Sequence, residues 1–199
     1  MLTIYHAPRS RSSRIIWLAE ELGCDYQIEL VSIKRGDGSG EPAPDSYAKI
    51  HPLKKVPAIS LNGEIVYESA GICLYLTDAF QKHSMGPLPG HNNRAEYVRW
   101  LFSYSGILEP VVTARFSGWD SAGPTGFGDL KVVEEQIADQ LEKTPYILGD
   151  EFSAADILYG STIAFFKGNL FPARKIYDDY LAKITARPAY ARSQAKDNG

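Results

Sequence analysis

The chain has 199 residues, of which 44% are hydrophobic and 23% are charged, a composition that excludes disordered, collagenous and coiled-coil proteins. Lysine and arginine number 21 against 24 aspartate and glutamate residues, which gives a formal net charge of −3 and no basic footprint for nucleic acid. The two cysteines, Cys24 and Cys73, form neither a close pair nor a Cys/His cluster, which argues against a disulfide framework and a zinc site.

The beginning of the chain carries no targeting signal of the secretory type. Residues 1–6 show no basic stretch followed by an apolar core, and no apolar run approaches the roughly 20 residues that a bilayer span needs. Together with the cysteine usage, this predicts a protein of the reducing cytoplasm.

The chain opens with one strand signal and one helix signal. Residues 2–6 form a short apolar run, which predicts a buried first strand. Apolar residues recur at helical spacing over 15–22 and predict a helix. Ser12 or Ser13 can cap the start of this helix and Gly23 can close its end.

Strand signals dominate the next part of the sequence. Apolar and polar residues alternate over 26–30, which predicts a second strand with one buried face. The glycine and proline content of 34–45 predicts a mobile surface loop. Two apolar runs, 56–61 and 64–67, flank Asn62-Gly63 and therefore predict an antiparallel hairpin.

The sequence predicts two domains joined by a linker. Glu68 and Ser69 open a helix that completes a βαβ-ββα unit over residues 1–80. Prolines and glycines with few large apolar residues mark 81–93 as a linker. The remainder, residues 94–199, has helical periodicity and predicts an all-α second domain.

Three helices of the second domain have clear signals. The first carries an apolar and aromatic stripe and should be kinked by Pro110. A second amphipathic helix covers 130–141, and the pair Ser153 and Asp156 forms a capping box that starts a third. Apolar residues surround the axis of this third helix over 157–166 almost completely, which predicts a central position. The stripe of the first helix comprises Tyr97, Trp100, Leu101, Tyr104, Leu108, Val111 and Val112.

Several short stretches carry a common pattern in their order and spacing. They are Pro8–Arg14, Trp17–Gly23, Val56–Ile59, Tyr67–Ile72, Ser153–Asp156 and Arg187–Tyr190. Together they resemble the cytosolic glutathione transferase family, in a serine-type and bacterial-like form, and the likeness runs from Met1 to about Ala195. The resemblance implies a thioredoxin-like α/β domain followed by an all-helical domain.

The resemblance also implies that glutathione is the co-substrate and that its thiol must be held as a thiolate. A free thiol has a pKa of about 8.5, and only the thiolate is the nucleophile. A hydroxyl donor at a helix N-terminus lowers that pKa. Ser10, two residues after Pro8 and four before Arg14, matches the position of the activating hydroxyl and is our catalytic candidate.

Two neighbouring serines and one tyrosine compete for this role. Ser12 and Ser13 are within one helical turn of Ser10, although a helix cap is the simpler function for either. Tyr5 is near the end of the first strand, where tyrosine-type members have their activating hydroxyl, but packing is the usual function of a strand tyrosine. Arg11 could add positive charge near the sulfur or simply be solvated.

The resemblance assigns the remaining glutathione contacts to two segments. Ser69 and the adjacent helix amides would hold the γ-glutamyl carboxylate, and Glu68 would lie near the amine. Val56 would pair its backbone with that of glutathione, and Pro57 would be cis. Lys55 could reach the glycine carboxylate or be solvated.

The segment before Val56 departs from the family pattern. This chain has Lys54 and His51 where the common pattern has a glycine and an asparagine. The departure weakens the support that the resemblance gives to a contact between Lys55 and the glycine carboxylate of glutathione. The four histidines, His6, His51, His83 and His91, show no metal-ligand spacing, and structural or surface roles are expected. An apolar wall for the electrophile could come from four residues that could equally be core, namely Tyr104, Ile107, Leu108 and Phe116.

The sequence supports one main hypothesis for the function of the protein and two alternatives. The first is a transferase that conjugates glutathione to small hydrophobic electrophiles, assembled as a homodimer, with no metal, nucleic-acid or membrane partner. The second is a glutathione-dependent peroxidase or thiol-disulfide oxidoreductase. Because no cysteine occurs between Pro8 and Arg14, a mixed disulfide there is excluded, but serine-type peroxide reduction is not. The third is a non-catalytic binding protein of the same fold.

Overall fold

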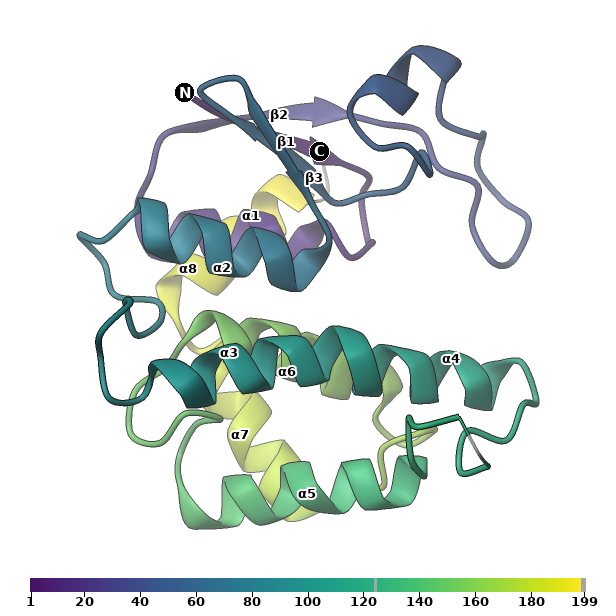
Figure 1. The fold of residues 1–199 in the computed structure, drawn as a ribbon, viewed down its shortest axis with the longest axis vertical. Helices are drawn as coiled ribbons and strands as arrows, with labels where there is room; N and C mark the ends of the chain where they lie inside the picture. Colours follow the sequence, from purple (N-terminus) through teal and green to yellow (C-terminus); the bar gives the residue numbers. More distant parts are fainter. Residues whose placement is uncertain (124, 198–199) are drawn as a thin grey trace. The chain divides into compact units, whose positions relative to one another are not determined.

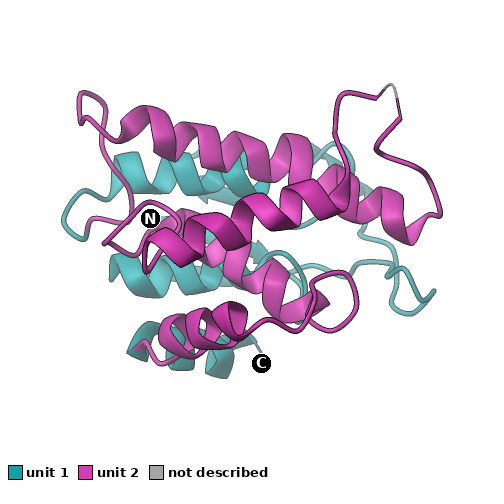
Figure 2. Cartoon of the chain, turned by 90° about the horizontal axis from the view of Figure 1, so that it is seen from below, with its two compact units in different colours: residues 1–83, 188–199 teal, residues 84–187 magenta. Residues whose placement is uncertain are grey.

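The structure is a computed structural model that describes residues 1–123 and 125–197. The described chain forms two compact units, one of residues 1–83 with 188–197 and one of residues 84–187 (Figure 2). Within the described residues, no helix combines the length and the apolar character that crossing a bilayer requires.

A four-stranded mixed sheet is the centre of the first unit. Its strands are β1 (Leu2–His6), β2 (Tyr26–Leu30), β3 (Ala58–Leu61) and β4 (Glu64–Tyr67). They are ordered β2-β1-β3-β4, with β1 parallel to β2 and antiparallel to β3, and β3 antiparallel to β4. The predicted strands and the hairpin at Asn62-Gly63 are therefore confirmed. The buried face predicted for 26–30 is wrong, because Tyr26 and Ile28 are half-buried and Leu30 is 68% exposed.

Helices cover one face of this sheet (Figure 1). They are α1 (Ser13–Leu22) and α2 (Ser69–Ala79), which contact each other and the strands. The last helix of this unit, α8 (Pro188–Asp197), packs against α1. As predicted, α1 is closed by Gly23, which has a left-handed φ of 59° that costs glycine no steric strain. A short 3₁₀ helix, η1 (Asp45–Lys49), follows the long loop after β2.

The last helix differs from the expected division of the chain. Residues 188–197 belong to the first compact unit, although the sequence pattern predicts that they are part of the helical domain. Glu20 of α1 holds this helix, because it accepts hydrogen bonds from Arg192 and Lys196 at 2.6 Å each, and from Tyr26 at 2.7 Å. Burial acts to raise the pKa of Glu20, but these partners outweigh it and lower the pKa to about 2.

The second unit is helical, as predicted. Its elements are α3 (Arg94–Ser103), η2 (Tyr104–Leu108), α4 (Glu109–Phe116), α5 (Leu130–Lys143), α6 (Ala154–Phe166) and α7 (Lys175–Thr185). Where the sequence predicts a kink, η2 is a π-helical turn that ends just before Pro110. Proline lacks the N–H that an α-helix would use at this position, which favours the wider turn.

α6 begins with the predicted capping box and occupies the core of its unit. Nine of the first ten residues of α6, 154–163, are buried. At Gly160 a Cβ atom would come within 2.2 Å of Ile184 Cδ1, so the close packing of α6 requires a glycine there. The last turn differs from the prediction, because Phe165 is 77% exposed. The apolar run at the end of this helix therefore extends beyond the core.

Candidate functional site

Three loop segments meet at one edge of the sheet. Tyr5 of β1 lies opposite Ala58 of β3, which in turn lies opposite Tyr67 of β4. The segment that follows β1, the segment that precedes β3 and the segment that follows β4 therefore share this edge. These segments carry Ser10, Val56-Pro57 and Glu68-Ser69, respectively.

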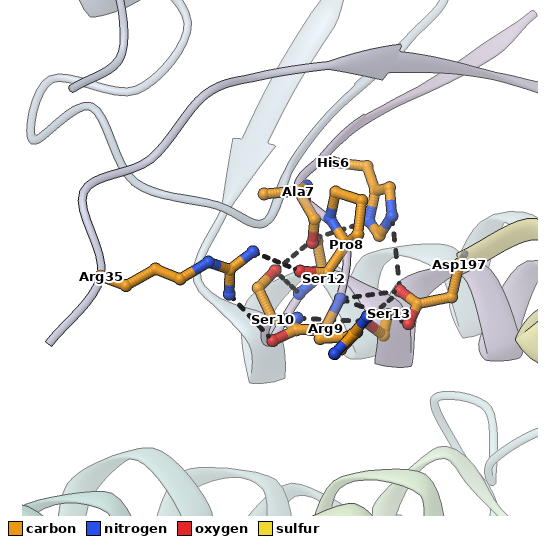
Figure 3. Close-up of polar contacts among 9 residues, drawn as sticks. All are labelled: His6, Ala7, Pro8, Arg9, Ser10, Ser12, Ser13, Arg35 and Asp197. Carbon is orange, nitrogen blue, oxygen red and sulfur yellow. Dashed lines mark hydrogen bonds and ion pairs between the residues drawn. The ribbon is translucent and has the colours of Figure 1, made fainter. Parts of the chain in front are cut away.

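Ser10 lies half-buried just before α1 (Figure 3). Its Oγ lies 2.7 Å from Ser12 Oγ and accepts a hydrogen bond from the Ser12 N–H at 3.1 Å. Its backbone N–H donates to Ser13 Oγ at 3.3 Å, and its carbonyl accepts from the Ser13 N–H at 3.1 Å. The hydroxyl is thus fixed near the positive end of the α1 dipole.

Ser12 has a different environment, because its side chain is fully buried. It is the residue before α1 but does not cap that helix. Its Oγ instead lies 2.8 Å from His6 Nδ1, and it accepts from the Ala7 N–H at 3.1 Å. The cap that we considered for Ser12 is therefore wrong: this hydroxyl links Ser10 to the end of β1.

Asp197, at the end of α8, is the carboxylate of this site. It accepts a hydrogen bond from the Ser13 hydroxyl and longer ones from the Arg9 N–H, at 3.3 and 3.4 Å. His6 Nε2, which has no hydrogen-bond partner within the described residues, lies 3.4 Å from Asp197 Oδ1, at ion-pair distance. Burial lowers the pKa of His6, and the charge of Asp197 opposes this shift.

Arg35 fixes the backbone of the loop before Ser10. Its guanidinium donates to the Pro8 carbonyl at 2.6 Å and to the Arg9 carbonyl at 3.3 Å. Arg9 has a left-handed φ of 53°, a conformation that costs a non-glycine residue about 1 kcal/mol or more. The bonds from Arg35 hold the loop in this conformation.

Tyr5 lies in the core rather than facing the loop. It is 8% exposed, and its ring centroid lies 5.6 Å from that of Tyr47, within a buried cluster. Burial and the nearby Glu29 raise its pKa. This environment agrees with the packing function that we considered for Tyr5. Arg11, by contrast, is exposed.

The segment before β3 contains the cis peptide bond Val56–Pro57, as the resemblance implied. Val56 packs against the cluster that contains Tyr47, and the Tyr47 hydroxyl donates to the Lys55 carbonyl at 3.0 Å. These contacts fix the backbone and leave the Lys55 side chain exposed.

Lys54 explains part of the departure from the family pattern. Its φ is 52°, a left-handed conformation that glycine adopts without strain. Its Nζ pairs with Asp45 Oδ1 at 2.9 Å. Of the two lysines, Lys54 is therefore engaged within the chain.

Glu68 and Ser69 begin α2 at the same edge. Glu68 is exposed and has a φ of 73°, and Ser69, the first residue of the helix, is 8% exposed. N–H groups of a first helical turn lack intrahelical partners and suit an anion. The nearby His51 is buried, and its ring centroid lies 4.7 Å from that of Tyr67. Burial lowers the pKa of His51, and Glu68 opposes this shift.

The four residues considered for an electrophile wall divide into core and surface. Tyr104 and Leu108 are buried in the core of the helical unit, where the Tyr104 hydroxyl lies 3.0 Å from Thr162 Oγ1. Ile107 is half-buried, and Phe116 is 58% exposed.

Over the described residues, no three His, Cys, Asp or Glu side chains lie close enough to hold a metal ion.

Sequence reasoning missed three residues of this site. The spacing of His6 predicts a structural or surface role, and neither Arg35 nor Asp197 belongs to a recognised motif. Asp197 is 188 residues from Arg9 along the chain, so no local pattern could connect them. The packing of α8 on α1 is what brings its carboxylate to the loop.

Comparisons with known proteins agree with this geometry. Residues 9–79 match a family model described as the N-terminal domain of glutathione S-transferase. Glutathione S-transferase 3 of Schizosaccharomyces pombe is 33% identical over 178 residues, which are 78% of this chain and 70% of that protein.

Two solved structures share the fold over nearly the whole chain. A glutathione S-transferase from Actinobacillus pleuropneumoniae is 25% identical, with a TM-score of 0.78 over 100% of this chain and 94% of that one. A sphingomonad glutathione S-transferase complexed with glutathione is 21% identical, with a TM-score of 0.79 over 98% of each chain.

Proposed function

Since the chain belongs to the glutathione S-transferase superfamily, we propose that it conjugates glutathione to small electrophiles through a thiolate held by Ser10. One observation carries this proposal. The Ser10 hydroxyl is half-buried before α1 and is held by Ser12 at the sheet edge that also carries Val56 and Ser69.

The chemical task at this position is to ionise a thiol near neutral pH. An isolated thiol has a pKa of about 8.5. A hydroxyl that donates to the sulfur stabilises the thiolate, and the N-terminal end of α1 adds favourable partial charge. Ser10 and Ser13 are both half-buried with fixed hydroxyls, but the Ser13 hydroxyl already donates to the Asp197 carboxylate, which favours Ser10 as the donor to the sulfur.

The other contacts of glutathione follow from the same edge. Ser69 and the first amides of α2 would bind the γ-glutamyl carboxylate, with Glu68 near the amine. The backbone of Val56, before the cis bond to Pro57, would pair with the peptide. Lys55, whose side chain is exposed, would reach the glycine carboxylate.

Replacing the hydroxyl tests the proposal directly. Loss of one charge-assisted hydrogen bond costs about 1.5–3 kcal/mol, so Ser10→Ala should reduce thiolate formation and turnover by roughly one to two powers of ten. Thiolate absorbance during a glutathione titration and turnover of an aryl halide measure the two effects. Ser161→Ala is the matched control, because the Ser161 hydroxyl donates within its own helix α6, to the Ile157 carbonyl at 2.6 Å.

The same experiment separates the alternatives. If Ser10→Ala behaves as wild type while Ser12→Ala or Tyr5→Phe collapses activity, the hydroxyl assignment is wrong. If the protein binds no glutathione at millimolar concentration, the binding or scaffold alternative replaces the transferase. Peroxide in place of the aryl halide tests for the peroxidase, and light scattering tests for the homodimer.

A further inference from the structure

A chain of polar atoms leads from Ser10 into the interior of the first unit (Figure 3). Ser10 Oγ lies 2.7 Å from Ser12 Oγ, Ser12 Oγ lies 2.8 Å from His6 Nδ1, and His6 Nε2 lies 3.4 Å from Asp197 Oδ1. Ser12 and His6 are fully buried, and Asp197 is 5% exposed. Only the outer end, Ser10, is partly open.

We propose that Asp197, His6 and Ser12 form a proton relay that takes the proton of the bound thiol and turns the Ser10 hydroxyl toward the sulfur. This inference rests on the proposed function, because it requires a thiol at Ser10. It assigns positioning and proton-accepting roles to residues behind the serine.

The resting direction of the hydrogen bonds follows from the partners. In a neutral His6, the hydrogen resides on Nε2, because that atom faces the Asp197 carboxylate. The Ser12 hydroxyl hydrogen has two acceptors within reach, the Ala7 carbonyl at 3.3 Å and His6 Nδ1 at 2.8 Å, and the shorter distance assigns it to His6 Nδ1.

The remaining acceptor capacity of Ser12 decides the direction at Ser10. The Ala7 N–H occupies one acceptor position of Ser12 Oγ, at 3.1 Å. The other position receives the Ser10 hydroxyl hydrogen. Ser10 therefore offers a lone pair, not a hydrogen, to an arriving S–H group.

Ionisation of the thiol reverses this direction. The S–H bond breaks and its proton passes to Ser10 Oγ, the Ser10 proton passes to Ser12 Oγ, and the Ser12 proton passes to His6 Nδ1. The products are a thiolate and an imidazolium, so protons and charge balance without another reactant. Ser10 now donates to the thiolate, Ser12 donates to Ser10, and His6 donates to Ser12.

The charges around His6 suit this role. Burial keeps the pKa of His6 low at rest, so the imidazole is neutral and able to accept a proton. The imidazolium would lie between two negative groups, the thiolate through the serines and Asp197 of α8. On the β2 side, the Val31 N–H donates to the His6 carbonyl at 2.7 Å. The thiol and His6 therefore titrate as a coupled pair.

Counting protons tests the relay. Glutathione is added to wild-type protein at neutral pH in weak buffer, with an indicator dye for released protons and ultraviolet absorbance for the thiolate. The relay predicts that far less than one proton reaches the solvent for each thiolate formed. Release of one proton per thiolate in wild type would overturn it, whatever the variants do.

Two variants locate the acceptor. In His6→Asn the amide takes the place of Nδ1 and can donate to Ser12 but cannot accept the proton, so release should rise to one proton per thiolate. Asp197→Asn removes the partner of the imidazolium and should lower the thiolate-to-thiol ratio about tenfold. Asp179→Asn, at an exposed position of α7 that pairs with Lys175 at 2.5 Å, is the matched control and should change neither value.

Nitrogen-15 NMR of the imidazole gives a readout that a structural role would not move. The His6 resonances, assigned by their absence in His6→Asn, should change from those of a neutral ring to those of an imidazolium when glutathione binds. A His6 ring that stays neutral beside a formed thiolate overturns the relay alone. If no thiolate forms in wild type, or if Ser10→Ala forms it equally well, the proposed function fails and the relay fails with it.

Discussion

The starts of α1 and α6 each combine serine with an aspartate carboxylate, but they use these groups differently. At α6, Asp156 Oδ2 accepts from the N–H and the hydroxyl of Ser153, at 2.8 and 3.0 Å. Its Oδ1 accepts from the Ile147 N–H at 2.8 Å and from the Tyr180 hydroxyl at 2.9 Å. Every partner is buried.

At α1 the same two residue types are not local to each other. Ser12 directs its hydroxyl away from its own helix, toward His6 and Ser10. The carboxylate comes from Asp197, 184 residues beyond Ser13. Ser10, at the outer end of this arrangement, stays half-buried.

The difference shows how one helix start serves stability and another can serve a ligand. A carboxylate with four donors leaves nothing for a further partner, so the Ser153–Asp156 box locks the core. A serine whose hydrogen can be directed inward or outward keeps one interaction available for a bound group. We therefore expect mutations at α6 to affect folding and mutations at α1 to affect thiol chemistry.

The largest expected effect on stability is at Asp156. Asp156→Ala removes the acceptor of the buried Ser153 and Ile147 N–H groups, whereas the Tyr180 hydroxyl keeps its 3.3 Å bond to the carbonyl of residue 156. Each donor left unsatisfied costs about 1–3 kcal/mol. The free energy of unfolding, measured with urea, should fall by about 3 kcal/mol or more. The exposed Asp139→Ala is the control. If Asp156→Ala loses no more unfolding free energy than Asp139→Ala, the start of α6 does not have the stabilising role that distinguishes it from the start of α1.

A smaller effect is expected at Glu20, which holds α8 and thereby Asp197. The folded-state pKa of Glu20 is lowered from 4.5 to about 2. A depressed carboxyl pKa contributes stability that is present above about pH 4.5 and is lost as the pH falls toward 2.

Glu20→Gln should therefore cost about 2 kcal/mol at neutral pH and flatten the acid limb of the stability profile. Urea unfolding across this pH range measures both. Glu135→Gln, which removes a solvent-exposed pair with Lys131 at 3.8 Å, should leave the limb unchanged. If the free energy of unfolding of Glu20→Gln still falls as the pH is lowered from about 4.5 to 2, another carboxyl group is responsible for the acid sensitivity.

The smallest effect is expected at Ser153. Ser153→Ala removes one hydroxyl of the capping box and should cost about 1 kcal/mol of unfolding free energy. Thiolate formation with glutathione should stay at the wild-type level, in contrast to Ser10→Ala. A thiolate defect in Ser153→Ala would show that the two helix starts do not have separate roles.

Local patterns were sufficient wherever the physical cause is local. Asn62-Gly63 placed the hairpin, Gly23 ended α1, and Ser153 with Asp156 started α6, because turns and caps depend on a few adjacent residues. The resemblance to the glutathione transferase family also singled out Ser10 and the segments at Val56 and Glu68. The register of the sheet brings those segments to one edge.

By itself, the sequence determined the order of the four strands, the helices α1 and α2 among them, the helical character of the second unit, the end of α1 and the start of α6. Only the tertiary structure decided that Tyr5 packs beside Tyr47, that α8 returns to α1, and that Asp197 and His6 lie behind Ser12. The reason is that hydrogen bonds between distant segments depend on how buried surfaces fit together. A linear pattern records spacing along the chain, whereas such contacts depend on distance in space.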